Sequence, residues 1–370
     1  MERAWIEVKR DVYEKNIQEL KRFIPEDTQI MAVVKGNAYG HGAAETAKYL
    51  NGLGIRAFAV ATLSEGIELR KSGVRGLILI LGFTSQEDMD KVLQYQLTQT
   101  VVDLAHARAL NHLGKKIPVH IKIDVGMHRL GEDPGNKTAL RQIFEMENLH
   151  IQGTYSHLSA SDGQDPESIR RTKQQISCFN HTVEEIRRWG FDPGKIHLQS
   201  SYGVVNYPGL QYDFVRIGIM LYGLKDDIRD QLKAPVRLYP ALSLKARVST
   251  VRDVHPGEYI SYGMDYPVCS LKKIATVTIG YGDGVPRNTG FRSLRVLIRG
   301  QYASVCGRIC MDQLMVDITG IGNVHSGDEV VFIGKSGSSE LSAEEMARRA
   351  DTITNELLSR LGGRLERKYI

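Results

Sequence analysis

The chain has 370 residues, with 48 lysines and arginines against 43 aspartates and glutamates, and its formal net charge is +5. Hydrophobic residues make up 42% of it and charged residues 25%, close to the globular average, so disordered and fibrous chains are excluded. The mild charge is far from the dense basic patch of a nucleic-acid binder, and no apolar run approaches the roughly 18 residues of a membrane span. We therefore expect this segment to contact neither nucleic acid nor a membrane.

The four cysteines, Cys178, Cys269, Cys306 and Cys310, have a spacing that fits no zinc pattern, so we expect no metal site. We interpret Cys306 and Cys310 as small buried residues rather than a redox pair. Sparse cysteine use favours a reducing compartment, and the first residues lack the apolar core of a signal peptide. We therefore expect a cytoplasmic chain, which can equally be the cytoplasmic domain of a larger membrane-anchored protein.

Short apolar runs alternate with stretches of helical spacing in the first two thirds of the chain. Continuous apolar runs such as LILILGF are typical of parallel strands covered on both faces. Helical segments such as 42–54 and 166–190 lie between them, and Gly190 stops the second. Eight strand–helix units favour a (β/α)8 TIM-type barrel, with a doubly wound sheet as the alternative. The expected strands are 29–35, 57–62, 77–83, 98–103, 119–125, 150–157, 195–201 and 214–223.

After about residue 235, short strands are separated by turn residues such as HPGE and SGDE, which predicts an all-β C-terminal domain. A helix-rich segment is expected at 343–363, and the strand-like residues 5–10 are expected to join the β domain. We thus predict a barrel at 11–235 and a β domain at 236–370, and we expect residues 1–10 to be part of the β domain. Its expected strands are 242–254, 258–264, 273–280, 293–300, 301–309, 315–320 and 328–334.

In such a barrel the carboxyl ends of the strands carry the site, so residues at those ends are candidates. Lys35 ends the first strand, either as a desolvated nucleophile able to form a Schiff base or as a lysine that extends into solvent. The fifth strand brings Lys122 and Asp124 onto one face, as an ion pair or as site residues, and Arg129 follows in a loop, suited to a substrate carboxylate. His157 ends the sixth strand, as a buried hydrogen-bonding group or as the neighbour of a bound ring.

The ends of the seventh and eighth strands carry Ser200, Ser201, Arg216 and Gly218, where this fold usually binds phosphate. A small hydroxyl residue and a glycine let backbone N–H groups approach an anion. A lysine on one side of the mouth and a phosphate cradle on the other suggest pyridoxal 5′-phosphate (PLP), with Arg216 where a ring nitrogen would lie.

The β domain contributes compact segments that contain Tyr262, Tyr281, Met311 and Asp312. Tyrosines in turns are usually packing residues. The GYGDG run lacks the spacing of a nucleotide-binding loop.

Six motifs occur in the order and spacing of the alanine racemase family, and they extend from about Trp5 to the end of the chain. They are VVKGNAYGHG, KIDVGMHRLG, VRIGIMLYG, ISYG, GYGDGVPR and GRICMDQ. The chain therefore resembles this family, which implies a barrel that holds PLP, a C-terminal β domain and a head-to-tail homodimer. Each active site of such a dimer takes groups from both subunits.

By this resemblance, Lys35 matches the lysine that binds PLP covalently, and Tyr262 matches the tyrosine that reaches in from the partner subunit. These two are the bases of a two-base racemisation. Lys122 matches a lysine that is often carbamylated. The matches to cofactor-binding residues are Lys35, Tyr39, His157, Ser201, Arg216, Gly218 and Ile219. The expected substrate-binding residues are Arg129, Tyr281, Met311, Asp312 and Asn355.

One departure from the family stands at Asn355, where a tyrosine that touches the phosphate and walls the substrate methyl is expected. Asparagine leaves room for a β-hydroxyl and can hydrogen-bond to it. The serine racemase domains of vancomycin-resistance membrane proteins show this kind of change, and the chain resembles them.

We therefore predict a PLP-dependent serine racemase with residual alanine activity. The alternatives are an alanine racemase that supplies D-alanine for peptidoglycan precursors, a barrel-type amino-acid decarboxylase, a cofactor carrier, and a sensor without turnover.

Overall fold

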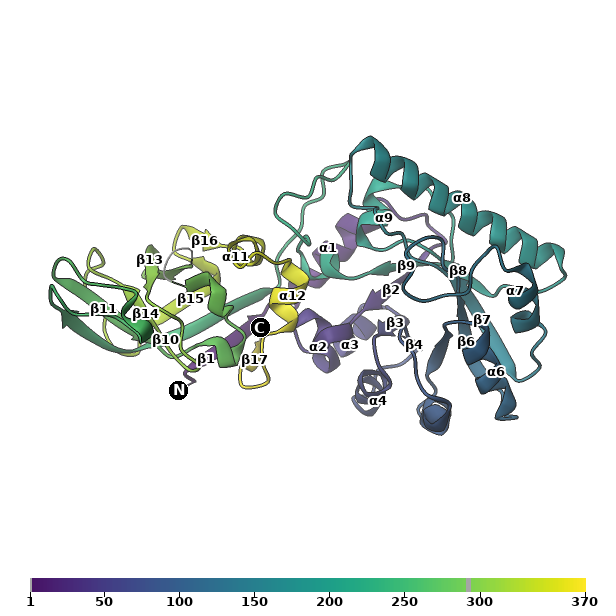
Figure 1. The fold of residues 1–370 in the computed structure, drawn as a ribbon, viewed down its shortest axis with the longest axis horizontal. Helices are drawn as coiled ribbons and strands as arrows, with labels where there is room; N and C mark the ends of the chain where they lie inside the picture. Colours follow the sequence, from purple (N-terminus) through teal and green to yellow (C-terminus); the bar gives the residue numbers. More distant parts are fainter. Residues whose placement is uncertain (1, 291–293) are drawn as a thin grey trace.

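The computed structural model describes residues 2–290 and 294–370, so Met1 and Ser293, which belong to two of the expected segments, lie outside it. A barrel and a β-rich part lie at opposite ends of an elongated molecule (Figure 1). The predicted combination of a (β/α)8 barrel and a C-terminal β domain is confirmed.

Eight parallel strands follow one another in chain order and close into a barrel, which excludes the doubly wound sheet. The last strand pairs with the first through Ala32 and Ile217, so the barrel has no free edge. Each of the eight expected strands is present, and each is shorter than predicted. They are β2 (Gln29–Val33), β3 (Ala57–Val60), β4 (Leu77–Ile80), β5 (Thr98–Val101), β6 (Ile117–Lys122), β7 (Leu149–Tyr155), β8 (Lys195–His197) and β9 (Phe214–Ile217).

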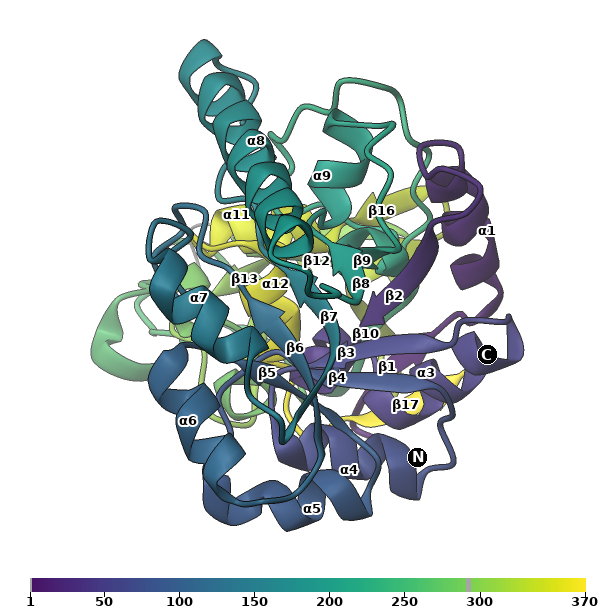
Figure 2. The same cartoon turned by 90° about the vertical axis from the view of Figure 1, so that its right-hand side faces the viewer.

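Helices surround these strands (Figure 2), which explains the continuous apolar runs: every residue of β3 and β9 is buried. The long helix α8 (Pro166–Arg188) begins at Asp165, whose carboxylate accepts hydrogen bonds from two backbone N–H groups, and it stops before Gly190, which has φ +88°. The other helices are α1 (Asp11–Lys21), α2 (Lys35–Tyr39), α3 (Ala43–Gly52), α4 (Leu63–Lys71), α5 (Met89–Gln94), α6 (Leu104–His112), α7 (Lys137–Phe144) and α9 (Ser201–Asn206).

The β domain is built on a nine-stranded sheet in the order β16-β15-β12-β13-β14-β11-β10-β1-β17. Its first strand, β1, comes from the N-terminus and lies between the long β10 and the last strand of the chain. The strands are β1 (Ala4–Val8), β10 (Leu242–Val254), β11 (Lys272–Val277), β12 (Arg295–Ile298), β13 (Gln301–Cys306), β14 (Leu314–Asp317), β15 (Glu329–Ser336), β16 (Ser339–Leu341) and β17 (Glu366–Tyr369).

The expected strand at 258–264 is wrong. The segment contains one isolated bridge, between Tyr259 and Pro267, and a 3-10 turn at Tyr262–Met264. Ser261 and Met264 have φ values of +70° and +55°, in the left-handed region that breaks a strand. Its apolar residues therefore belong to a strained turn, and the sequence pattern alone does not distinguish the two.

The free cysteines include a buried Cys306 and a half-buried Cys310, with no disulfide among the residues described. No described helix combines the length and apolar character needed to cross a bilayer.

Two helices of the C-terminal part, α11 (Ala343–Arg349) and α12 (Thr354–Ser359), lie between the sheet and the barrel (Figure 1). The loop after β2 approaches α12 so closely that a Cβ at Gly40 would overlap the carbonyl oxygen of Leu358. Gly40 also has φ +81°. At the start of α12, the Thr354 N–H donates to the carbonyl oxygen of Asp226, which follows the neighbouring strand β9, at 2.8 Å. These contacts hold α12 against the mouth.

We predict that Gly40→Ala destabilises the protein by about 3 kcal/mol or more, because it combines left-handed strain with steric overlap. Gly54→Ala is the matched control: Gly54 has φ +92°, but a Cβ added there would meet no atom within 4 Å, so only the cost of about 1–2 kcal/mol for the backbone applies. Chemical denaturation measures both free energies of unfolding. Equal losses would show that the approach of α12 does not constrain Gly40.

Candidate active site

The chain turns left-handed directly after β2. Gly36, Asn37, Ala38 and Tyr39 have φ values of +62°, +54°, +54° and +51°, so α2 is a left-handed turn. Such a conformation costs a non-glycine residue about 1–2 kcal/mol, and strain of this kind gathers at functional sites. The Asn37 side chain stabilises the turn by accepting the N–H of Ala43 at 2.8 Å.

This turn places the side chains of Lys35 and Tyr39 in one cavity of about 350 Å³. Of the residues predicted for the site, the cavity is lined by Lys35, Tyr39, Lys122, Arg129, His157, Ser201, Arg216, Gly218, Ile219 and Asn355. They come from the ends of five strands and from α12, so the structure brings together the barrel residues and Asn355.

The amine of Lys35 lies in a partly desolvated place. Burial lowers its pKa, and the positive charge of Arg129 lowers it further. A lowered pKa raises the fraction of free amine at neutral pH, which is the form that attacks an aldehyde. This environment fits the interpretation of Lys35 as a nucleophile rather than the solvent-exposed alternative.

Arg216 is 3% exposed and donates to neutral acceptors. One terminal nitrogen donates to His197 Nδ1 at 2.7 Å; the other donates to the carbonyl oxygens of Ser156 and Leu198 at 2.6 and 2.9 Å and to His157 Nδ1 at 3.1 Å. No carboxylate pairs with it in the described part of the chain. Burial lowers the pKa of Arg216 to about 10, so it is still a cation at neutral pH.

A second histidine continues this line of hydrogen bonds into the barrel. His197 Nε2 and His120 Nδ1 are 2.8 Å apart, and both rings are buried. Because Arg216 donates to His197 Nδ1, the His197 ring is neutral with its proton on Nε2, which then donates to His120. Burial, followed by the charge of Arg216, lowers the pKa of both rings, that of His120 to about 3. The pair therefore orients Arg216 without adding charge.

Lys122 is 6% exposed, and its amine donates to the carbonyl oxygen of Ile123 at 2.9 Å. Burial, then the charge of Arg216, lowers the pKa of Lys122 to about 7, and Arg129 adds to this. Arg129 itself is exposed and has no ion pair or hydrogen bond within residues 2–290 and 294–370. The Arg129 guanidinium at the cavity wall is therefore available to a ligand. The Lys122 amine is partly neutral at pH 7 and so can act as a nucleophile.

The possible ion pair between Lys122 and Asp124 does not form. Asp124 instead accepts hydrogen bonds at 2.9–3.0 Å from the N–H groups of Gly126, Met127 and His128, and so shapes the loop that leads to Arg129. Strand β6 ends at Lys122, so the alternation that put both residues on one face stops before Asp124.

At the opposite wall, Ser201 Oγ accepts the N–H of Gly218 at 3.0 Å. A Cβ at Gly218 would stand 2.7 Å from the hydroxyl oxygen of Tyr39, so any other residue there would require the Tyr39 ring to shift. The cavity wall here is formed by residues that lie close together: Tyr39, Ser201 and Gly218. Ile219 follows Gly218 at the same wall.

The four predicted β-domain residues do not line this cavity. Tyr262, Met311 and Tyr281 are 68%, 52% and 40% exposed. Backbone hydrogen bonds hold the segments of two of them together, since Tyr281 N donates to Cys310 O and Gly282 N to Met311 O. Asp312 accepts from Arg364 at 2.5 Å. We call these four residues (Tyr262, Tyr281, Met311 and Asp312) the β-domain set; within one chain they are separate from the barrel site.

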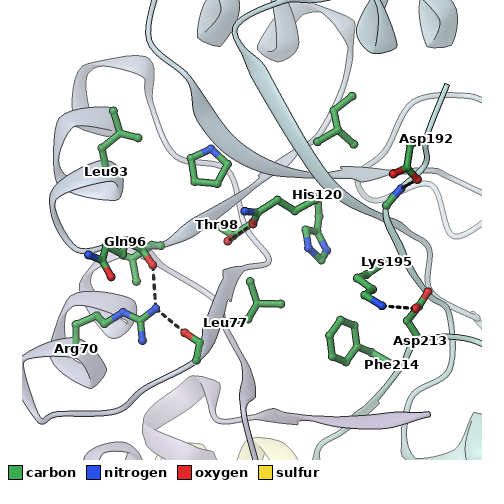
Figure 3. A pocket seen from close by; sticks show the side chains of 16 residues that line it. Arg70, Leu77, Leu93, Gln96, Thr98, His120, Asp192, Lys195, Asp213 and Phe214 are labelled. Carbon is green, nitrogen blue, oxygen red and sulfur yellow. Dashed lines mark hydrogen bonds and ion pairs between the residues drawn. The ribbon is translucent and has the colours of Figure 1, made fainter. Parts of the chain in front are cut away.

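A larger cavity of about 870 Å³ opens at the other end of the barrel, among the first residues of its strands (Figure 3). Its charged groups already have partners. Lys195 binds Asp213 at 2.8 Å, Arg70 donates to the carbonyl oxygens of Gly76 and Gln96, and Asp192 accepts the N–H of Gly194. Active sites of this fold lie at the carboxyl ends of the strands. The smaller cavity around Lys35 is therefore the candidate active site.

Sequence reasoning missed several residues of the site. Tyr155 stacks on His197 with the ring centroids 4.7 Å apart, and Tyr202 and Asp226 line the cavity. A signal was available for the first two, because Tyr155 stands within the expected strand 150–157 and Tyr202 directly follows the expected strand 195–201. Asp226 follows the last strand in an irregular segment, where no pattern shows the direction of a side chain.

Two family models match the chain: "Alanine racemase, N-terminal domain" over residues 8–226 and "Alanine racemase, C-terminal domain" over residues 241–369. An amino-acid racemase of Enterococcus faecalis is 43% identical over 98% of this chain and 51% of its own length. A serine/alanine racemase of Enterococcus gallinarum is 41% identical over 95% of this chain and 49% of its own. The chain thus spans about half the length of these relatives.

Among solved structures, an alanine racemase of Clostridium difficile 630 superposes with a TM-score of 0.92 at 34% identity. It covers all of this chain, which in turn covers 96% of that one.

The pKa of Lys122 leads to a prediction on stability. With a folded-state pKa of about 7 against an ordinary value of 10.5, the unfolded state binds more protons between these two pH values, so burial of this lysine destabilises most below pH 7 and not at all above 10.5. In carbon-dioxide-free buffer, Lys122→Met should therefore unfold at higher denaturant concentration than the wild type near neutral pH, and this gain should shrink as pH rises. Denaturation at several pH values measures it, with the exposed Lys21→Met as control. A gain that does not vary with pH would contradict the burial of a titrating amine.

Proposed function

The chain belongs to the alanine racemase family, and on this premise we propose that it is a PLP-dependent amino-acid racemase that interconverts L- and D-serine and retains some alanine activity. The observation that carries the serine preference is Asn355: it lines the same cavity as Lys35, and its Oδ1 is buried without a hydrogen-bond partner within the described residues. An unpaired buried acceptor discriminates in favour of a ligand that carries a donor.

Members of the family depend on PLP, and the residues of this cavity fit that cofactor. The cavity is lined by a lysine with a lowered pKa, by the buried cation of Arg216, and by Tyr39, Ser201 and Gly218, where a Cβ at position 218 would stand 2.7 Å from the Tyr39 hydroxyl oxygen. Lys35 would hold the aldehyde, Arg216 and His157 the ring, and four residues the phosphate: Tyr39, Ser201, Gly218 and Ile219. When bound, PLP withdraws electrons from the substrate Cα and makes its proton acidic.

Racemisation removes the Cα proton from one face and returns a proton to the other, so two bases on opposite faces are needed. We assign them to Lys35 and to Tyr262 of the partner subunit. The lowered pKa of Lys35 suits an amine that alternately accepts and gives a proton. Arg216 keeps its proton at neutral pH, since its pKa is about 10, and so holds its neighbours without exchanging protons with them.

The exposure of the β-domain set supports a homodimer with shared active sites. Tyr262 is 68% exposed and lines no part of its own chain's cavity, so the proposed base needs a second subunit. A head-to-tail arrangement would place the β-domain set of each chain at the barrel mouth of the other, with Met311, Asp312 and Tyr281 beside the substrate.

Arg129 is the proposed partner of the substrate carboxylate, which its planar donors suit. Lys122 is the proposed carbamylated lysine: its free amine would attack carbon dioxide at carbon, release one proton and leave a carbamate anion among the cations Arg129 and Arg216. The resemblance also leads to predictions about the cell. They are a cytoplasmic location, attachment to a membrane region in a longer protein, and a role in vancomycin resistance or in the supply of peptidoglycan precursors.

Incubation of the PLP-loaded protein with L-serine and L-alanine separately, followed by chiral chromatography, tests the activity. We expect D-serine to form with the larger kcat/KM. Asn355→Tyr should reverse this preference by roughly tenfold or more, because it removes the unpaired acceptor and fills the space of a β-hydroxyl. Ser359→Ala, in the last turn of the same helix, is the control. Faster D-alanine production by the wild type would favour the alanine racemase alternative.

The shared active site is tested by mixing two inactive variants, Lys35→Ala and Tyr262→Phe. In a hybrid dimer, one site has both intact bases and the other has neither, so refolding the two variants together at equal amounts should restore roughly a quarter of the wild-type activity. Each variant refolded alone is the control. No recovery on mixing, in a protein that remains dimeric by light scattering, would contradict the contribution of Tyr262 of the partner subunit.

A further inference from the structure

Asp226 lines the cavity, and neither the cofactor nor the acid–base pair uses it. It stands after the 3-10 turn Ile219–Tyr222, and its backbone is fixed on both sides. Its N–H donates to the hydroxyl of Tyr202 at 2.8 Å, and its carbonyl oxygen accepts the N–H of Thr354 at 2.8 Å. The second bond ties Asp226 to the residue next to Asn355, so both side chains stand on one wall.

The polar atoms on this wall are mostly acceptors. Burial raises the pKa of Asp226, and a side-chain hydrogen bond with Asn355 acts against that rise, so the two side chains are neighbours. Oδ1 of Asp226 and Oδ1 of Asn355 are both buried, and neither has a hydrogen-bond partner within residues 2–290 and 294–370. Two unpaired buried acceptors leave a place for a donor from a ligand.

The charges around Asp226 indicate which chemical group of a ligand could donate the missing hydrogen bond. Burial, together with the negative potential of Asp230 and Asp162, raises the pKa of Asp226 to about 6, so it is mainly ionised at neutral pH. A phosphate or a substrate carboxylate is an anionic acceptor and would be repelled here. The cation that acts on Asp226 is Lys35, whose amine is the proposed base at the substrate Cα. The side-chain donor nearest to Cα in a small amino acid is a β-hydroxyl, whose oxygen is two bonds away.

We propose that Asp226 is a specificity-determining residue, which together with Asn355 accepts the hydrogen bond of the substrate β-hydroxyl. This inference rests on the proposed serine racemase function and adds a second acceptor to it. With alanine, the methyl group would cover both acceptors and leave them without a donor or water. The cost of that unpaired pair appears as a lower kcat/KM for alanine.

The test compares kcat/KM for L-serine and L-alanine in the holoenzyme and in three variants. Asp226→Leu keeps the approximate volume and removes both acceptors, so the serine-to-alanine ratio should fall roughly tenfold. Asp226→Asn keeps an acceptor oxygen and should retain most of the ratio. Asp227→Asn is the matched control, because Asp227 binds Arg229 at the surface, does not line the cavity, and should leave the ratio unchanged. Asp226→Ala replaces the leucine variant if that variant does not fold.

A binding measurement accompanies the kinetics. Dissociation constants of the phosphonate analogues of serine and alanine, from absorbance titration of the holoenzyme, should show the same fall in preference in Asp226→Leu. PLP affinity, measured by dialysis and absorbance, should not change.

An unchanged ratio overturns the inference. So does an equal loss for both amino acids, which indicates a structural role, or a change in PLP affinity alone, which places the carboxylate at the phosphate. The activity of the wild-type protein distinguishes a failure of the proposed function from a failure of the role proposed for Asp226. If it does not racemise serine, the proposed function fails, and the inference fails with it. If it does, only the variants decide the role of Asp226.

Discussion

A buried arginine cation without a carboxylate partner among the described residues is the constraint on which the site depends. Arg216 donates its hydrogen bonds to carbonyl oxygens and neutral histidines, so its charge is not cancelled inside the barrel. After burial, that charge is the next cause of the lowered pKa of Lys122, His157 and His197, and it also acts on Lys35. Two lysines and two histidines therefore tend toward neutrality around one fixed cation. A neutral amine is what both the attack on an aldehyde and the attack on carbon dioxide require.

The barrel supplies this electrostatic environment, whereas the C-terminal helix α12 supplies Asn355, which we propose favours serine. Contact of Leu358 with Gly40 near the end of α12, and of Thr354 with the Asp226 backbone at its start, fixes α12 against the mouth. Asn355 lies in the first turn of that helix and so reaches the same cavity as Lys35. The residues proposed to hold the cofactor thus come from the barrel, whereas Asn355 comes from the C-terminal part of the chain and meets Asp226 at the barrel mouth.

Local sequence patterns predicted the structure best in the barrel, where helices cover the strands. Continuous apolar runs identified the eight barrel strands, and a residue at or just beyond a strand end was a fair guide to the cavity for Lys35, Lys122 and Arg216. The same rule failed at Asp124, because β6 had already ended, and at 258–264, where left-handed residues carry a strand-like composition. Backbone conformation in such turns depends on contacts from distant residues, as with Ser261, whose hydroxyl donates to the carbonyl oxygen of Arg308.

The number of barrel strands, the change to a β domain and the family could be predicted from the sequence, because they follow from periodicity and from motifs that are contiguous in the chain. Which polar atoms are left without partners became visible in the folded chain alone. His120 lies beside His197, and Asp226 beside Asn355, although the members of each pair are far apart in the chain. Hydrogen-bond satisfaction depends on distances between atoms that folding brings together, and no local pattern contains them.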